Sequence, residues 1–203
     1  MTISFDNIGK QYGSTWVLRS MNYVFESGTR YGITGANGAG KSTLMKLLSG
    51  VLTPSEGQRT YTQNENVLEA LDVPLHIAFA APYIDLIPEM TLQESLNFHC
   101  TFKATYLAKE DIAERLLLKG HEGKLIKEFS SGMQQRLKVG LALLTKSAVL
   151  LLDEPTSNLD EQGMSWYHEL VHEFAQDRLL VVASNVASDF QGIDERIDIQ
   201  AYK

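Results

Sequence analysis

The chain has a single cysteine among its 203 residues and no apolar run that approaches the length of a membrane-spanning helix. With Cys100 alone, no disulfide forms within the chain, which is typical of a reducing compartment. The longest apolar runs, at residues 141–144 and 148–152, are far shorter than the roughly 20 residues that a bilayer requires. The N-terminus also lacks the basic and apolar regions of a signal peptide. These absences predict a soluble protein.

Positive charge is also scarce. Lysine and arginine number 18 against 25 acidic residues, which gives a formal net charge of −7. An acidic chain has no broad positive field for duplex DNA or RNA, so we expect no nucleic-acid partner. Backbone N–H groups and one or two cations can still bind a phosphate group locally. The composition therefore argues against nucleic acids but not against nucleotides.

The spacing of apolar residues predicts one α/β domain with a helical insert, because strand-like segments flank a long stretch of helical periodicity. At 203 residues and 44% hydrophobic composition, the chain can bury one sizeable core. The expected strands lie at 3–8, 17–25, 30–34, 148–152 and 179–183, and the expected helices at 41–49, within 91–145, and at 164–175.

Residues 35–42 read GANGAGKS and match the phosphate-loop pattern G-x-x-x-x-G-K-[ST]. The glycines allow consecutive N–H groups to turn toward an anion, and the helix that follows adds its positive end. Lys41 is expected to reach the β- and γ-phosphates, and the Ser42 hydroxyl to ligate Mg²⁺. A chance match occurs in about 1% of chains of this length. The expected nucleotide-binding residues of this segment are Gly35, Asn37, Gly38, Ala39, Gly40, Lys41, Ser42 and Thr43.

Two adjacent acids, Asp153 and Glu154, end the apolar strand at 148–152. Neighbouring residues at a strand end point in different directions, so the two carboxylates can have separate roles. Asp153 is expected to hold Mg²⁺, directly or through water, and Glu154 to activate the attacking water as a general base. A solvated acidic turn is the simpler alternative, but the phosphate loop favours the functional interpretation.

Residues 129–136 read FSSGMQQR and precede the acidic strand. This segment resembles the signature motif of ATP-binding-cassette (ABC) ATPases, and residues 153–160 (DEPTSNLD) resemble the Walker B strand and D-loop of that family. The resemblance covers nearly the whole chain. It implies a P-loop NTPase fold of ABC type, in which a mixed sheet with helices carries an N-terminal antiparallel β subdomain and an inserted α-helical subdomain. Residues 1–88 and 146–203 would form the nucleotide-binding core of this single domain, and residues 89–145 the helical subdomain.

The resemblance also implies a head-to-tail dimer, in which ATP lies between the phosphate loop of one subunit and the signature of the other. Ser130, Ser131, Gly132 and Asp160 would then bind nucleotide across the interface. Ser130 can also cap the helix that follows it. Tyr12 lies where the family places an aromatic residue that stacks on adenine, although a purely structural tyrosine is the alternative. Met133, in place of the usual glutamine, removes one polar contact.

Two further positions depart from the family pattern. Pro82 lies where the family carries a glutamine that senses Mg²⁺ and the attacking water, and proline has neither a polar side chain nor an N–H. Asn185 aligns with the switch histidine, which bonds the γ-phosphate. Asparagine can donate an amide hydrogen bond but cannot carry a proton. With Lys41, Glu154 and Asn185 as the catalytic set, we expect an ATPase that is slow in isolation.

The leading hypothesis is an ATP-binding and ATP-hydrolysing subunit of an ABC transporter, with ATP and Mg²⁺ as cofactors. Its expected partners are a second cassette, identical or different, and a separate integral membrane permease, which would place it on the cytoplasmic face of the cytoplasmic membrane. The apolar stretch at residues 83–90 lies where the family docks that permease, although ordinary core packing is the alternative. The alternatives are a soluble, non-transport ABC ATPase and a nucleotide-gated regulator that hydrolyses ATP weakly. The transported substrate is read in the membrane partner.

Overall fold

The computed structural model describes all 203 residues, and its chain separates into two compact units. The first unit comprises Met1–Phe79, Ser147–Glu154 and Asp177–Lys203, and the second comprises Ala80–Lys146 and Pro155–Gln176. The domain boundaries that the sequence suggests, at 88/89 and 145/146, stay a prediction.

The first unit begins with an antiparallel sheet in the strand order β2-β1-β4-β5. Its strands are β1 (Thr2–Tyr12), β2 (Thr15–Glu26), β4 (Glu56–Gln63) and β5 (Asn66–Val67). Strand β1 pairs with β2 on one edge and with β4 on the other. Ile3 and Phe5 are buried one pleat apart, as expected for a strand with one face on the core. The antiparallel β subdomain predicted from the sequence is therefore present.

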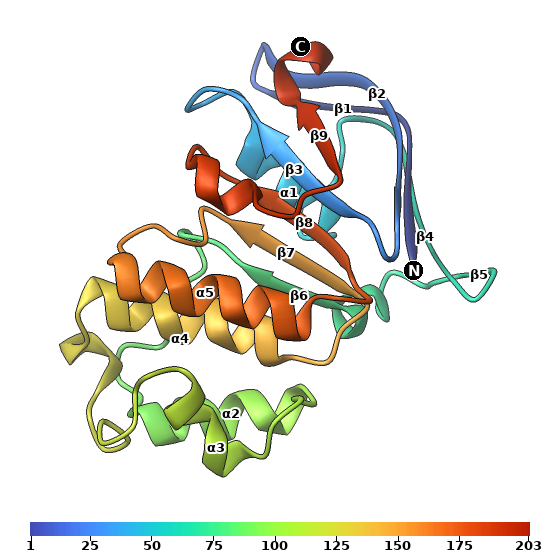
Figure 1. Cartoon of the computed structure of the whole chain (residues 1–203). Coiled ribbons are helices and arrows are strands. Elements are labelled where there is room, and N and C mark those ends of the chain that lie inside the picture. The colour runs from blue at the N-terminus through green and yellow to red at the C-terminus, as the bar shows by residue number, and fades with distance from the viewer. The chain divides into compact units, whose positions relative to one another are not determined.

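A second sheet of five strands follows the order β6-β7-β8-β3-β9. It contains β3 (Arg30–Thr34), β6 (Ile77–Ala80), β7 (Val149–Asp153), β8 (Leu179–Ala183) and β9 (Glu195–Asp198). Strand β8 pairs in parallel with β3 and β7, and every residue of β7 and β8 is buried. Figure 1 shows β3 and β7 running in the same direction. Continuous apolar runs are what parallel strands covered on both faces require.

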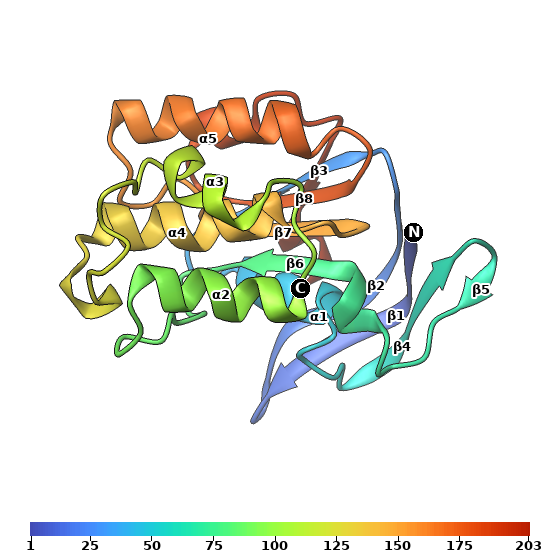
Figure 2. The same ribbon diagram turned by 90° about the horizontal axis from the view of Figure 1, so that it is seen from below.

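Helix α1 (Lys41–Leu48) follows β3 and contributes to the hydrophobic core of the first unit. Leu44, Met45, Leu47 and Leu48 are all buried, together with side chains of β1–β4 and of β7–β9. Burying one such side chain contributes about 1.5–3 kcal/mol, so these four residues anchor the middle and the end of this short helix. Figure 2 shows α1 beside the antiparallel strands. The short 3-10 helices of this unit are η1 (Val73–His76), η3 (Ala187–Phe190) and η4 (Ile199–Tyr202).

The second unit is helical. It contains α2 (Leu92–Phe102), α3 (Lys109–Arg115), η2 (Ile126–Glu128), α4 (Ser131–Leu144) and α5 (Glu161–Phe174). Helices α4 and α5 lie side by side in both views (Figures 1 and 2). Thr91 and Glu94 form a capping box at the start of α2, which explains why that helix begins there. None of the helices combines the length and the apolar character needed to cross a bilayer.

Candidate nucleotide-binding site

Three strands of the parallel sheet end at the same level, and this register assembles the site. Ala183, the last residue of β8, lies opposite Asp153 of β7 and opposite Ile33 of β3. The residues that follow these strands therefore emerge at one edge. They are Gly35 of the phosphate loop, Glu154, and Asn185. Polar groups beyond the carboxyl ends of parallel strands are the usual place for ligands in α/β proteins.

The phosphate loop has the backbone that an anion requires. Gly38 and Gly40 adopt φ angles of 75° and 112°, which side-chain-bearing residues rarely tolerate. A β-carbon on Gly40 would also lie 2.8 Å from Val17 Cγ1, so glycine is needed there for space as well as conformation. Helix α1 begins directly after Gly40 with no side-chain cap. Its first N–H groups and its positive dipole end are thus left for a ligand.

The Lys41 side chain is 6% exposed and is held by three oxygen atoms. Its ammonium group donates to the Gly35 carbonyl at 2.9 Å, to the Ala36 carbonyl at 3.5 Å and to Asn185 Oδ1 at 2.9 Å. Glu154 Oε1 lies 4.0 Å away. The cation is therefore fixed in the loop before any phosphate group binds.

Asn185 joins the cation to the acid. Its Oδ1 accepts from Lys41, and its Nδ2 donates to Glu154 Oε1 at 3.2 Å and makes a close hydrogen bond to Asn37 Oδ1. The orientation of this amide is determined by its partners, because an ammonium group only donates and a carboxylate only accepts. A neutral imidazole has one donor and one acceptor at fixed positions on a ring. An amide offers both functions at a single end, which suits a bridge between two adjacent charges.

Glu154 combines an unusual backbone with an altered acidity. Its φ angle is 49°, a left-handed conformation that costs a non-glycine residue about 1–2 kcal/mol. Its N–H donates to the Ala183 carbonyl at 2.7 Å, which stabilises this turn. Burial raises the pKa of the Glu154 carboxyl above its ordinary value, and the nearby Lys41 opposes this shift. A raised pKa suits a carboxylate that has to accept a proton.

A second pair of residues supports Glu154 and was not found from the sequence. The Ser184 hydroxyl lies 2.6 Å from Asp189 Oδ2 and 3.3 Å from Glu154 Oε2, and both Ser184 and Asp189 are buried. The hydrogen bond from Ser184 lowers the pKa of Glu154 and thus partly offsets the effect of burial. No sequence motif marks these two positions. Only the turn at Val186, whose N–H donates to the Ser184 hydroxyl, brings them together.

A cavity of about 440 Å³ lies at this edge, within the size range of ligand sites. Seven of its lining residues were predicted from the sequence: Asn37, Gly38, Gly40, Lys41, Ser42, Thr43 and Glu154. Val17 also lines the cavity and was not predicted. Asp153 is 1% exposed at the end of β7. Tyr12 is the last residue of β1, is 49% exposed and does not line the cavity. Adenine stacking on Tyr12 stays a prediction.

The signature segment lies in the second unit. The Ser130 hydroxyl accepts from the Met133 N–H at 3.2 Å and caps α4, as the sequence predicts. A β-carbon on Gly132 would lie 3.1 Å from the Asn158 carbonyl oxygen, so only glycine fits there without a shift. Asp160 caps α5 by accepting from the Gly163 N–H at 2.8 Å. The roles of Ser130, Ser131, Gly132 and Asp160 in nucleotide binding stay predictions.

Pro82 has a local partner of its own. Its carbonyl accepts from Lys138 Nζ at 3.3 Å, within the same unit. Burial lowers the pKa of Lys138, and the charge of Asp85 opposes that shift. The correspondence of Pro82 to the glutamine position of the family stays a prediction.

Comparison with known proteins decides the family. The family model described as "ABC transporter" matches residues 18–157, which include the phosphate loop, the signature segment and the acidic strand. The chain belongs to the ABC transporter family. It is an ATP-binding subunit with the ATPase chemistry of that family, and the resemblance seen in the sequence is confirmed.

Curated relatives of this ABC protein carry matching descriptions. It is 31% identical over 186 residues to the "Uncharacterized ABC transporter ATP-binding protein YybJ" of Bacillus subtilis (strain 168). The aligned region covers 90% of this chain and 85% of YybJ. It is 28% identical over 201 residues to the "Bacitracin transport ATP-binding protein BcrA" of Bacillus licheniformis. The aligned region covers 97% of this chain and 66% of BcrA.

Solved structures confirm the fold class. One, described as "Structure of ATP binding subunit of ABC transporter", aligns with a TM-score of 0.83 at 21% identity and covers 98% of this chain and 87% of the other. The ATP-binding cassette MJ0796, in a dimeric post-hydrolysis state bound to ADP and Pi, aligns with a TM-score of 0.81 at 19% identity. This alignment covers 98% of our chain and 95% of the MJ0796 chain. At these identities the likeness concerns the fold.

Proposed function

We propose that this ABC subunit binds ATP at the phosphate loop and hydrolyses it with Glu154 as general base and Asn185 as the residue that connects the base to Lys41. The observation that carries the proposal is the hydrogen-bonded series Lys41–Asn185–Glu154 at the carboxyl ends of β3, β7 and β8. A cation that reaches phosphate oxygens and a base of raised pKa are thereby held at a fixed separation.

The reaction is an in-line displacement at the γ-phosphorus. A water molecule attacks the phosphorus while Glu154 accepts its proton, the bond to the β-γ bridging oxygen breaks, and ADP and phosphate are the products. Lys41 and the free N–H groups at the start of α1 stabilise the charge that spreads over the transferred oxygens. Asn185 can give its Nδ2–H to a γ-phosphate oxygen once ATP displaces its present partners.

Mg²⁺ is the expected metal, with the Ser42 hydroxyl and the Asp153 carboxylate as its protein ligands. Magnesium favours hard oxygen ligands and commonly takes only one or two from protein, the rest coming from phosphate groups and water. No group of three or more histidine, cysteine or acidic residues forms an all-protein metal site in the structure. When bound, the ion would neutralise charge on the β- and γ-phosphates.

The partners proposed for this subunit are a second cassette and an integral membrane permease, which together would place it at the cytoplasmic face of the membrane. The capped N-terminus of α4 supports the first, because Ser130 satisfies one N–H of the helix and leaves the dipole end available to a partner's γ-phosphate. The names of relatives such as BcrA support the second.

The experiment is size exclusion with light scattering on Glu154→Gln in Mg-ATP and in Mg-ADP. Glutamine keeps the shape and an acceptor oxygen but removes the base, so we expect an ATP-dependent dimer that persists. Glu69→Gln removes the same charge from an exposed residue and should behave as wild type. A monomer of Glu154→Gln in both nucleotides would reject a homodimer and leave a heterodimer as the functional form.

A nucleotide-gated regulator that scarcely hydrolyses ATP is the second candidate. It is favoured by Pro82, whose carbonyl accepts a hydrogen bond from Lys138, because a proline at this position has no glutamine side chain to reach the metal. The steady-state rate decides between the two. Turnover that vanishes in Glu154→Gln supports the ATPase, and ATP binding with no turnover in the wild type supports the regulator.

A further inference from the structure

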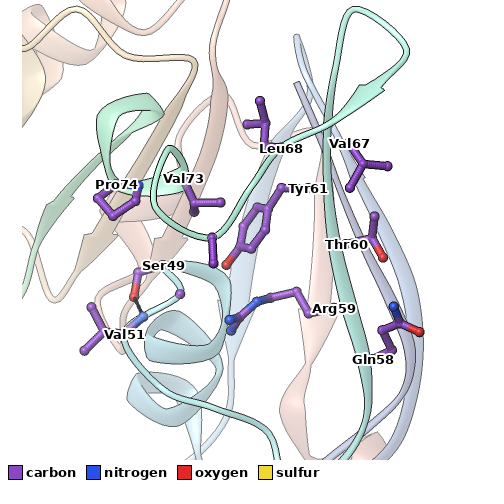
Figure 3. Close-up of a pocket in the computed structure, with 12 residues that line it drawn as sticks. Ser49, Val51, Gln58, Arg59, Thr60, Tyr61, Val67, Leu68, Val73 and Pro74 are labelled. Atoms are coloured by element: carbon purple, nitrogen blue, oxygen red, sulfur yellow. Dashed lines mark hydrogen bonds between the residues drawn. The ribbon is translucent and has the colours of Figure 1, made fainter.

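A second cavity, of about 540 Å³, lies at the opposite end of α1 from the phosphate loop. Figure 3 shows its walls, which come from strand β4, from the turn around β5, from the segment after α1 and from η1. The apolar side chains around it are those of Val51, Val67, Leu68, Val73 and Pro74. Val51 and Val67 are exposed at the rim, which leaves the cavity open to solvent.

One charge lines this cavity. Arg59 donates from Nη1 to the Leu47 carbonyl, and to the Leu52 carbonyl at 3.0 Å. Its Nε is buried without a hydrogen-bond partner, and its Nη2 forms no hydrogen bond, so Nη2 keeps its donors for a ligand in the cavity that Arg59 lines. No acidic residue lines the cavity, and Arg59 takes part in no ion pair.

The surroundings compensate this charge only in part. The carbonyl end of helix α1 is partly negative and offsets some of the guanidinium charge, but no carboxylate in the cavity lining balances it. The Tyr61 ring centroid lies 5.1 Å from the Arg59 guanidinium carbon and adds a cation–π contact. Burial raises the pKa of Tyr61 to about 12, so its hydroxyl stays neutral and donates to the Leu48 carbonyl at 2.9 Å. Burial also lowers the pKa of Arg59, which reflects the cost of a cation without a counter-ion.

We propose that this cavity is a binding site for a small amphipathic carboxylate, whose carboxylate group pairs with Arg59 Nη2 and whose hydrocarbon part contacts Val51, Val67 and Leu68. Charge complementarity selects the head group, since the cavity offers an accessible guanidinium donor and no acid. The apolar walls select the body. A volume of about 540 Å³ lies within the range that accommodates small organic ligands.

The site is separate from the nucleotide site. The two cavities share no lining residue, and they lie at the two ends of the same helix. A carboxylate can also bind a phosphate loop, so the two sites have to be separated in any titration. Filling the phosphate loop with a non-hydrolysable ATP analogue and Mg²⁺ achieves this, because it prevents a carboxylate from binding there.

The test is a titration of the full chain with octanoate, in the presence of the saturating ATP analogue, followed by amide NMR shifts and by calorimetry. Octanamide, which has the same chain and no charge, is the matched ligand. We expect millimolar octanoate to shift the signals of residues around Arg59 and Leu68, and octanamide to bind at least about tenfold more weakly. Equal binding of the two ligands, or no binding of octanoate at millimolar concentration, overturns the proposal.

A pair of exposed substitutions avoids disturbing the fold. Val51 is 78% exposed at the rim, and Leu71 is 87% exposed and outside the cavity lining. Val51→Glu places a negative charge beside the carboxylate site, so it should weaken octanoate binding by about tenfold or more, whereas Leu71→Glu should leave it unchanged. Equal affinities of the two variants would show that octanoate binds elsewhere and would overturn the assignment.

Discussion

The two ends of helix α1 have opposite partial charges, positive at the start and negative at the end, and side chains of different kinds lie beside them. At its start, Lys41 and free N–H groups form a positive site, and the acid that balances it, Glu154, is linked through Asn185. At its end, the carbonyls of Leu47 and Leu48 carry partial negative charge, and they accept hydrogen bonds from Arg59 and from the Tyr61 hydroxyl. One end therefore has its charges paired, while the other holds a cation with no acid beside it.

The two ends of α1 therefore have different expected roles, in nucleotide binding at the start and in stability at the end. At the start of α1, Lys41 and Glu154 are already held by Asn185, and on the proposed mechanism ATP would replace part of these hydrogen bonds. At the end of α1, Arg59 hydrogen-bonds to the carbonyls of Leu47 and Leu52, while its Nε and Nη2 make no hydrogen bond. Variants at the start should therefore alter ATP binding and turnover, and variants at the end should alter stability.

The largest effect is expected for Lys41→Ala. Loss of the charged hydrogen bonds to the phosphate groups should weaken ATP binding by about 30- to 1,000-fold, or about 2–4 kcal/mol, as measured by calorimetry. Lys46→Ala removes the same charge from the last turn of the same helix and is the control. If Lys41→Ala binds ATP as tightly as the control, the comparison between the two ends fails.

Arg59→Ala should act on folding. It removes hydrogen bonds to the carbonyls of Leu47 and Leu52, so we expect the free energy of unfolding to fall by about 2–4 kcal/mol in urea denaturation. Arg19→Ala breaks a partly exposed ion pair with Glu56 and should cost less than about 1 kcal/mol. Equal losses for the two variants would show that Arg59 does not support the end of α1.

Asn185→His should raise the rate of ATP hydrolysis by about tenfold or less, equivalent to at most about 1.4 kcal/mol. Histidine can donate to the γ-phosphate, but Asn185 already makes part of that contact, and Pro82 limits the gain. Asn185→Ala should lower the rate of ATP hydrolysis, because it removes the side chain that hydrogen-bonds both Lys41 and Glu154. Unchanged turnover in both variants would mean that Asn185 does not act on the γ-phosphate.

The smallest effect is expected for Ser184→Ala. Activity requires deprotonated Glu154, and burial already raises the pKa of this carboxyl, so the acid limb of the pH–rate profile should lie above that of an ordinary glutamate. The Ser184 hydrogen bond lowers the pKa of Glu154, so its removal should move the limb further up, by less than about one pH unit. A downward movement would contradict this arrangement.

Much of the parallel sheet was predictable, for a simple physical reason. Strands β3 and β8 were predicted to the residue, and β7 to within one residue at each end, because strands covered on both faces consist of apolar runs that end at polar residues. The predicted ends of β7 and β8 also identified Glu154 and Asn185, which follow these strands, as candidate site residues. Helix α5 begins at Glu161, one turn before the predicted start, because the Asp160 cap allows a helix to include Gly163.

Other features depend on contacts that a local pattern does not reveal. Strand β9 was missed, since only Ile197 among its four residues is buried and the rest are charged. Ser184 and Asp189 meet through a turn, and Arg59 of β4 reaches the end of α1 with its side chain. Each depends on residues that come together only in the folded chain.

The most direct test measures ATP affinity and ATP turnover on the same samples of wild type, Lys41→Ala and Glu154→Gln. The two variants should separate binding from chemistry. Lys41→Ala should lose affinity, while Glu154→Gln should keep wild-type affinity or bind more tightly and lose at least about a hundredfold in turnover. Hydrolysis by Glu154→Gln at the wild-type rate would contradict the assignment of Glu154 as the base, and with it the role of the Lys41–Asn185–Glu154 series.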